Sequence, residues 1–332
     1  MTTQKQQRIF ITGATGYIGL RVTEFALSKG YLVHGLSRSA AGTAKLESLG
    51  AVPVPGDLLS LSTLRMEAAQ SDVVIHLADA WIDDFSQPYE KIIAIDAAAV
   101  DAMTQGLAES KKTRKLLIDT SGVGVVKPDD HDAETDEKSP IDPNPMNGRI
   151  HRERYNLSKA GEGGVRVCVM RLPPFVYGRG SSGIKMFMHI FAKLGLVVRV
   201  GDGTTRTSVV HVDDAARAYL LVVQHACLED GDVQAVYNVT SSTEVTFREL
   251  TAAMADTMGL PLREMSFIQA AAEAGPLVAG FLSLRVRGKS DKARQELGWA
   301  PVEAMGIIED IRNGSYVDVA KEIMAAAQES KA

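Results

Sequence analysis

The chain has 332 residues, of which 45% are hydrophobic and 23% charged, so it can bury a sizeable core and is not disordered as a whole. Its net charge of −5 argues against nucleic acids and anionic membranes as partners, since both bind basic surfaces. The two cysteines, Cys168 and Cys227, offer neither a disulfide framework nor a metal-binding CxxC pair, and no apolar run is long enough to span a membrane.

Short apolar runs alternate with helical patterns through the first half of the chain. Strands are predicted at 9–11, 32–36, 52–54, 73–77, 115–119 and 165–172. Helices are predicted at 17–28, 41–49, 60–70, 88–109 and 147–162. Apolar strands that alternate with helices are typical of a parallel sheet, because each connection must cross back over one face. The predicted fold class is α/β: a doubly wound, Rossmann-type parallel sheet with helices on both faces.

The pattern after residue 178 is less regular. Helices are predicted at 184–194, 213–223 and 247–258, short strands at 207–210 and 235–239, and small helices beyond 260. The acidic, proline-rich segment 128–145 is interpreted as a solvated surface loop, and the alternative is a lid over a site.

The strongest motif is a GxxGxxG that directly follows the first predicted strand and opens a helix. Gly13 permits the tight turn, Gly16 lets a diphosphate approach the backbone, and Gly19 allows close packing of helix on strand. The helix N-terminus then presents free N–H groups to the diphosphate. The motif therefore predicts a dinucleotide site that includes Thr15, Tyr17 and Ile18.

The end of the second predicted strand carries Ser37 and Arg38, where an acidic residue would bind the ribose 2′-hydroxyl of NAD. A guanidinium suits a 2′-phosphate instead, so the sequence favours NADP(H) over NAD(H). A solvated loop arginine is the alternative interpretation.

These motifs resemble those of the extended, epimerase/dehydratase-like branch of the short-chain dehydrogenase/reductase superfamily. The resemblance covers residues 8–302. It adds cofactor contacts at Asp57 and Leu58 after the third strand, at Leu77 and Ala78 after the fourth, and at Pro173 in the segment Arg171–Gly178 beside the nicotinamide. It implies residues 1–178 with about 207–240 as the NADP-binding domain, and about 179–206 with 241–332 as a smaller C-terminal substrate lobe.

The resemblance also implies hydride transfer assisted by a tyrosine, a lysine four residues later and a serine. Tyr155 and Lys159 fit that spacing, and Ser121 follows the fifth strand. In the family, however, the tyrosine lies roughly 20 residues or more before the Arg-Pro segment, whereas Tyr155 lies 16 residues before Arg171.

Two hypotheses therefore stay open for the catalytic helix. In the first, the helix is short and Tyr155 and Lys159 act as usual. In the second, their spacing is a coincidence and the working face carries Arg149, His151 or Glu153, as in a branch that has an arginine–glutamate pair here. Asp96 is a further departure, since the family often has an asparagine there. His76 is interpreted as a packed, hydrogen-bonded residue.

Aromatic residues near the expected carboxyl edge of the sheet predict an apolar substrate pocket lined by Trp81, Phe175 and Tyr177. The leading hypothesis is a cytoplasmic, NADPH-dependent reductase of a hydrophobic ketone or aldehyde, with an imine as a variant. The alternatives are a nucleotide-sugar epimerase or dehydratase, whose second diphosphate Arg179, Lys185, Arg199 or Arg206 would bind, and a non-catalytic NADP-binding regulator. No metal is implied, and a homodimer through helices 88–109 and 147–162 is expected from the resemblance.

Overall fold

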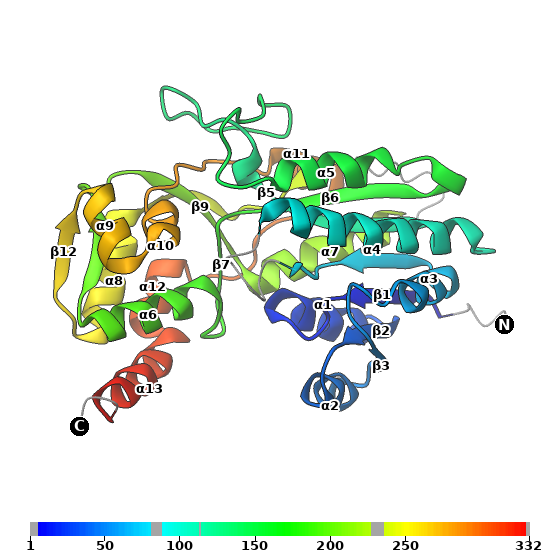
Figure 1. The fold of residues 1–332 in the computed structure, drawn as a ribbon, viewed down its shortest axis with the longest axis horizontal. Helices are drawn as coiled ribbons and strands as arrows, with labels where there is room; N and C mark the ends of the chain where they lie inside the picture. Colours follow the sequence, from blue (N-terminus) through cyan, green and yellow to red (C-terminus); the bar gives the residue numbers. More distant parts are fainter. Residues whose placement is uncertain (1–5, 81–87, 113, 227–235, 330–332) are drawn as a thin grey trace.

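Figure 1 shows the computed structural model, which describes residues 6–80, 88–112, 114–226 and 236–329. The larger lobe contains a seven-stranded sheet of order β10-β6-β5-β4-β1-β2-β3, and every pairing in it is parallel. Its strands are β1 (Arg8–Thr12), β2 (Leu32–Ser37), β3 (Val52–Pro55), β4 (Val73–His76), β5 (Leu116–Gly122), β6 (Arg166–Leu172) and β10 (Val236–Asn238). The predicted fold class is confirmed.

Helices cover both faces of this sheet because successive side chains of each strand point to opposite sides. Ile9 and Ile11 of β1 pack on one side and Phe10 on the other. The first side carries α1 (Tyr17–Ser28), α2 (Ala40–Leu49), α7 (Val212–Ala226) and α11 (Asp291–Leu297). The second carries α3 (Leu61–Gln70), α4 (Tyr89–Glu109) and α5 (Arg149–Ser158).

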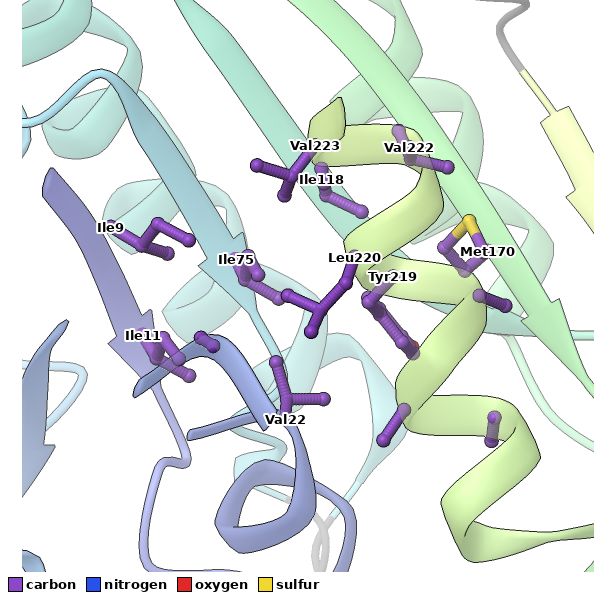
Figure 2. Close-up of a cluster of buried hydrophobic side chains, with 14 of the residues drawn as sticks. Ile9, Ile11, Val22, Ile75, Ile118, Met170, Tyr219, Leu220, Val222 and Val223 are labelled. Carbon is purple, nitrogen blue, oxygen red and sulfur yellow. The ribbon is translucent and has the colours of Figure 1, made fainter. Parts of the chain in front are cut away.

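Figure 2 shows the first of these two cores. Ile9, Ile11, Ile75, Ile118 and Met170 project from four neighbouring strands toward Tyr219, Leu220, Val222 and Val223 of α7 and Val22 of α1. All ten side chains are at most 1% exposed, which makes this core the rigid base on which the carboxyl ends of the strands are held.

The smaller lobe holds two short sheets and the remaining helices (Figure 1). One sheet has the order β11-β9-β7, and the other pairs β12 with β8. The strands are β7 (Phe175–Tyr177), β8 (Val197–Val200), β9 (Arg206–His211), β11 (Ser242–Thr246) and β12 (Leu262–Met265). The helices are α6 (Ser182–Leu194), α8 (Phe247–Met258), α9 (Phe267–Ala274), α10 (Pro276–Phe281), α12 (Ile307–Asn313) and α13 (Tyr316–Glu329).

The segment 128–145 is a surface loop whose middle is anchored. Thr135 forms a bridge to Gly288, and Asp132 pairs with Arg206 at 2.5 Å. Glu137 accepts a hydrogen bond of 2.7 Å from the backbone N–H of Asn238. These contacts fix the loop to segments that come later in the chain, so its end can form part of a binding wall.

Two further expectations concern the whole chain. Cys168 is fully buried, and burial raises its thiol pKa, so its interpretation as an unreactive core residue is confirmed. Cys227 lies outside the described residues. Within the described ranges, none of the helices is long and apolar enough to cross a membrane.

Candidate active site

A polar cluster lies at the carboxyl ends of the central strands, on the face covered by α4 and α5. Thr12 of β1 is in register with His76 of β4, and His76 is in register with Asp119 of β5. Ser121 follows Asp119 by two residues and so points to the same face. Phe10, Val74 and Leu117 point to the core beneath α4. Thr12, His76 and Asp119 follow them by two residues on the same strands, so they point to the same side and lie together with Ser121.

A cavity of about 680 Å³ opens beside this cluster. Eleven of the thirteen predicted cofactor residues line it: Gly13, Thr15, Gly16, Tyr17, Ile18, Gly19, Arg38, Asp57, Leu58, Leu77 and Ala78. It continues along Asp79 and Thr120 to Pro174 and Val176. The cavity is thus large enough for a drug-sized or dinucleotide ligand and runs from β2 across β1 and β4 to β5.

The glycine turn fits a diphosphate. Gly13 has φ +70°, and a Cβ on it would lie 2.7 Å from the backbone nitrogen of Ala78. A Cβ on Gly19 would overlap the carbonyl oxygen of Gly13. Helix α1 begins after Gly16 with no side-chain cap, so its first N–H groups face the cavity, where a nicotinamide dinucleotide would place its diphosphate.

The end of β2 supplies the features expected for the adenosine half. Arg38 is exposed and lines the cavity, whereas Ser37 is buried and donates a hydrogen bond of 3.1 Å to the Ser39 carbonyl. Ser37 therefore shapes the turn behind Arg38. Asp57 accepts hydrogen bonds from Ser60 Oγ and the Leu59 N–H, which holds the turn after β3 against the cavity wall.

A second cavity, of about 290 Å³, adjoins the first and shares Asp79, Thr120 and Pro174 with it. Its wall is mostly apolar. Its polar lining residues include Ser121, Asn147, Arg149 and Arg152, and its apolar ones include Pro173, Met146 and Phe281. Met146 comes from the end of the anchored loop and Phe281 from α10, so the two lobes and the loop close this cavity together.

Two arginines of α5 bind carboxylates at the cavity wall. Arg149 Nη2 donates to Asp79 at 3.0 Å. Arg152, whose side chain is 3% exposed, donates from Nη1 to Asp96 at 3.1 Å and from Nη2 to the Thr120 carbonyl. Burial opposes ionisation of Asp96, but Arg152 and His76 outweigh it and lower the Asp96 pKa to about 2.

Two groups in this cluster lack hydrogen-bond partners among the described residues. They are the carboxylate of Asp119 and the hydroxyl of Ser121. Asp119 is fully buried, and this burial raises its pKa even though Arg152 lies 3.6 Å away. At this wall Arg149 pairs with Asp79 and Arg152 pairs with Asp96, so each of the two guanidinium groups has a carboxylate partner.

The predicted tyrosine–lysine pair lies elsewhere on α5. Tyr155 donates its hydroxyl to Asp101 of α4 at 2.8 Å, and Lys159 pairs with the same carboxylate at 2.7 Å. Burial and this hydrogen bond raise the Tyr155 pKa, which is the opposite of what proton transfer near pH 7 requires. Neither side chain is among the described residues that line the two cavities.

The alternative catalytic residues predicted on α5, Arg149, His151 and Glu153, lie in three different environments. Arg149 lines the smaller cavity, and His151 is exposed. Glu153 is buried and binds Arg171 of β6, with Oε2 3.0 Å from Nε. Helix α5 ends at Ser158, because a turn with left-handed glycines at 161, 163 and 164 leads into β6, and this shortening produces the unusual spacing before Arg171.

Two of the three predicted substrate residues, Phe175 and Tyr177, lie in the core of the smaller lobe. Phe175 is 2% exposed and packs against Phe187 and Phe247, with ring centroids 6.1 and 6.0 Å away. Tyr177 is also buried and donates to the Met305 carbonyl at 3.0 Å. Trp81 lies outside the described residues.

Sequence reasoning did not single out Asp79 or Arg152 as site residues. Asp79 could have been found as a charged residue three positions after a buried strand. Arg152 could have been found because it follows Arg149 by three residues, which places both on one face of a helix. The interpretation of His76 as a packed residue is confirmed, because it is fully buried between Thr12 Oγ1 at 2.6 Å and Asp96 at 2.9 Å.

One trio within the described ranges has ligand atoms close enough for a metal: His211, Asp213 and Glu303. Asp213 is bound by Arg179 at 2.8 Å, and Glu303 by Arg217 at 2.8 Å. Both carboxylates are thus engaged by guanidinium groups, and the trio is better described as part of an ion-pair network.

Comparisons with known proteins agree with this geometry. The model of the NAD dependent epimerase/dehydratase family matches residues 9–240. An uncharacterized protein of Saccharomyces cerevisiae is 32% identical over 308 residues, which cover 92% of this chain and 98% of that protein. The 4-hydroxy-2-methyl-3-oxo-4-farnesyl-3,4-dihydroquinoline-1-oxide ketoreductase of Stigmatella aurantiaca is 26% identical over 323 residues, 88% of this chain and 92% of that one. The solved UDP-glucose 4-epimerase of Thermotoga maritima has the same fold, with a TM-score of 0.71 at 20% identity over 95% of this chain and 99% of that chain.

Proposed function

Because the chain belongs to the NAD-dependent epimerase/dehydratase family, we propose that it reduces a neutral, hydrophobic ketone or aldehyde with NADPH, with an imine as a variant substrate. The observation that carries the proposal is the smaller cavity: a mostly apolar wall that adjoins the cofactor groove and presents Ser121 and Arg149. Arg38 at the end of β2 supports the preference for NADPH over NADH. The similarity to a ketoreductase supports a carbonyl substrate.

The charge balance of the site also favours a neutral substrate. Asp79 and Asp96 pair with Arg149 and Arg152, the two arginines of α5 that line the smaller cavity, so little positive charge is left there for a second diphosphate. Three of the cations that a nucleotide sugar would require are engaged as well, since Arg179, Arg199 and Arg206 bind Asp213, Glu264 and Asp132. These contacts count against the epimerase alternative.

In the proposed reaction a bound nicotinamide supplies the hydride. Ser121 Oγ, which has no partner among the described residues, turns about χ1 to donate a hydrogen bond to the substrate carbonyl oxygen. Arg149, 21% exposed, donates a second hydrogen bond and stabilises the negative charge that develops on this oxygen. Solvent at the open side of Arg149 then supplies the proton that converts the alkoxide into an alcohol.

The test is NADPH oxidation with a panel of hydrophobic ketones, aldehydes and cyclic imines. Ser121→Ala and Arg149→Gln should each lower kcat about 100-fold, as the loss of one donor to a developing oxyanion does. Tyr155→Phe, a matched removal of one hydroxyl on the same helix as Arg149, should leave kcat within about two-fold.

Three outcomes would count against the proposal. A collapse of activity in Tyr155→Phe alone would favour the usual tyrosine acid. Tightly retained NAD with no net cofactor turnover would favour an epimerase. Binding of NADP without turnover of any compound in the panel would favour a regulator.

A further inference from the structure

A continuous chain of hydrogen bonds connects the two cavities beneath their shared wall. Arg152 donates to Asp96 Oδ1, Asp96 Oδ1 lies 2.9 Å from His76 Nε2, and His76 Nδ1 lies 2.6 Å from Thr12 Oγ1. Thr12 Oγ1 in turn accepts from the backbone N–H groups of Leu77 and Ala78, both at 3.3 Å. The chain therefore begins at an arginine of the smaller cavity and ends at the backbone of the larger one.

The directions of these bonds follow from donor counting. The Thr12 hydroxyl has one hydrogen and already accepts two N–H groups, so that hydrogen goes to His76 Nδ1. His76 is then the neutral Nε2–H tautomer and donates to Asp96. Asp96 keeps its negative charge for Arg152, and Asn156 Nδ2 donates to its other oxygen at 3.3 Å.

Arg152 is held on several sides, but not every N–H group of its guanidinium has a hydrogen-bond partner among the described residues. Nη1 is occupied by Asp96, Nη2 is occupied by the Thr120 carbonyl, and Nε has no hydrogen-bond partner in the described part of the chain. A buried guanidinium N–H with no partner is destabilising. Arg152 lines the smaller cavity, so a ligand oxygen that reaches its guanidinium would give it a further acceptor.

The course of the larger cavity identifies which part of a dinucleotide comes near. With the diphosphate at Gly13–Gly19 and the adenosine half toward Arg38, the remaining half extends past Leu77–Asp79 to Thr120. Thr120 and Asp79 also line the cavity that contains Arg152. In a dinucleotide bound this way, the hydroxyls of the nicotinamide-side ribose would be the cofactor oxygens nearest to this junction.

We propose that Arg152 binds the nicotinamide-side ribose, and that Asp96 and His76 are positioning residues that hold its guanidinium there. The proposal rests on the proposed function only for the identity of the cofactor. It also gives the buried carboxylate of Asp96 a role, since its ion pair with Arg152 holds the guanidinium at the cavity wall.

The test compares ligands that contain or lack this ribose. Calorimetry gives the Kd of NADP⁺ and of adenosine 2′,5′-bisphosphate, and in parallel of NAD⁺ and ADP, for the full chain without substrate. Arg152→Lys keeps the charge beside Asp96, and we expect it to weaken dinucleotide binding about 10-fold while the shorter ligand of each pair changes less than two-fold. Asp96→Asn should also weaken dinucleotide binding relative to binding of the shorter ligand, by about three-fold or more.

The matched control is Arg154→Lys, the same chemical change at an exposed position of α5. It should leave all four Kd values within two-fold, and thermal melting of each variant reports whether the fold is kept. A purely structural role for Arg152 would lower the affinities of long and short ligands together and would overturn the proposal, as would no change in either.

The outcomes separate this proposal from the proposed function. Loss of the dinucleotide-specific affinity in a chain that reduces no carbonyl compound would retain the role of Arg152 and reject the reductase. Wild-type protein that binds neither dinucleotide would overturn both.

Discussion

Replacing Arg38 by alanine tests the cofactor preference directly. The side chain is exposed at the end of β2 and lines the cavity, so its contact with a 2′-phosphate would be a partly screened, charge-assisted hydrogen bond. Such bonds contribute about 1.5–3 kcal/mol when well formed, and solvent exposure lowers this to about 1–2 kcal/mol.

We therefore expect Arg38→Ala to weaken NADP⁺ binding by about 5- to 30-fold and to leave NAD⁺ binding unchanged, since NAD⁺ has no 2′-phosphate. Calorimetry measures the Kd of both cofactors at low and high salt. The effect of Arg38→Ala on the Kd of NADP⁺ should become smaller at high salt, because salt screens the exposed cation. Lys45→Ala, which removes a cation from the exposed face of α2, is the control. Equal losses for NADP⁺ and NAD⁺, or no loss for either, would refute the role assigned to Arg38.

Three other variants test the buried architecture. Glu153→Gln leaves the buried Arg171 guanidinium without its counter-charge and should lower the free energy of unfolding in urea by about 3–5 kcal/mol, and a loss under about 1 kcal/mol would contradict the buried pair. Asp119→Asn should raise stability at neutral pH, because each unit by which the folded pKa exceeds the unfolded value near 3.9 costs the folded state about 1.4 kcal/mol there. Because the folded pKa of Asp119 is raised, the wild type loses stability as pH rises from about 4 toward that folded pKa. The extra stability of Asp119→Asn should therefore vanish at about pH 3–4. A stability difference that does not depend on pH would show that Asp119 does not titrate this way. Gly19→Ala places a methyl group on the Gly13 carbonyl, so it should abolish binding of both NADP⁺ and NAD⁺ if the turn tolerates no shift, and unchanged affinities would refute the close packing.

The central sheet could be predicted because its signals are local. Apart from β3, which is mostly exposed, each strand from β1 to β6 is a largely buried run between turn residues. Helix α8 was predicted at its observed bounds, and a capping box of Thr246 and Glu249 marks its start. Strands β7, β8, β11 and β12 were not predicted. They have three to five residues and pair with segments distant in the chain, such as β8 with β12, so their stability comes from tertiary contacts that no local pattern encodes.

The wall of the larger cavity was predictable for the same reason, since eleven of the thirteen residues predicted to bind the cofactor line it, on or near turns that follow strands. The substrate side was not. Phe175 and Tyr177 are apolar residues near the correct edge, but their direction depends on the pairing of β7 with β9, which turns them into the core of the smaller lobe. A composition argument cannot distinguish an aromatic residue that lines a pocket from one that packs behind it.

Tyr155 and Lys159 have the predicted spacing but do not line either of the two cavities. The pair lies one turn apart, as an acid–base pair requires, yet both side chains bind Asp101 of the adjacent helix. Arg149 and Arg152, three residues apart near the start of α5, meet Asp79 and Asp96 at the cavity. Spacing along a helix does not specify which neighbouring element each side chain meets. The carboxylate partners of the two arginines lie just after β4 and on α4, at the carboxyl ends of the central strands, and these ion pairs hold Arg149 and Arg152 at the cavity wall.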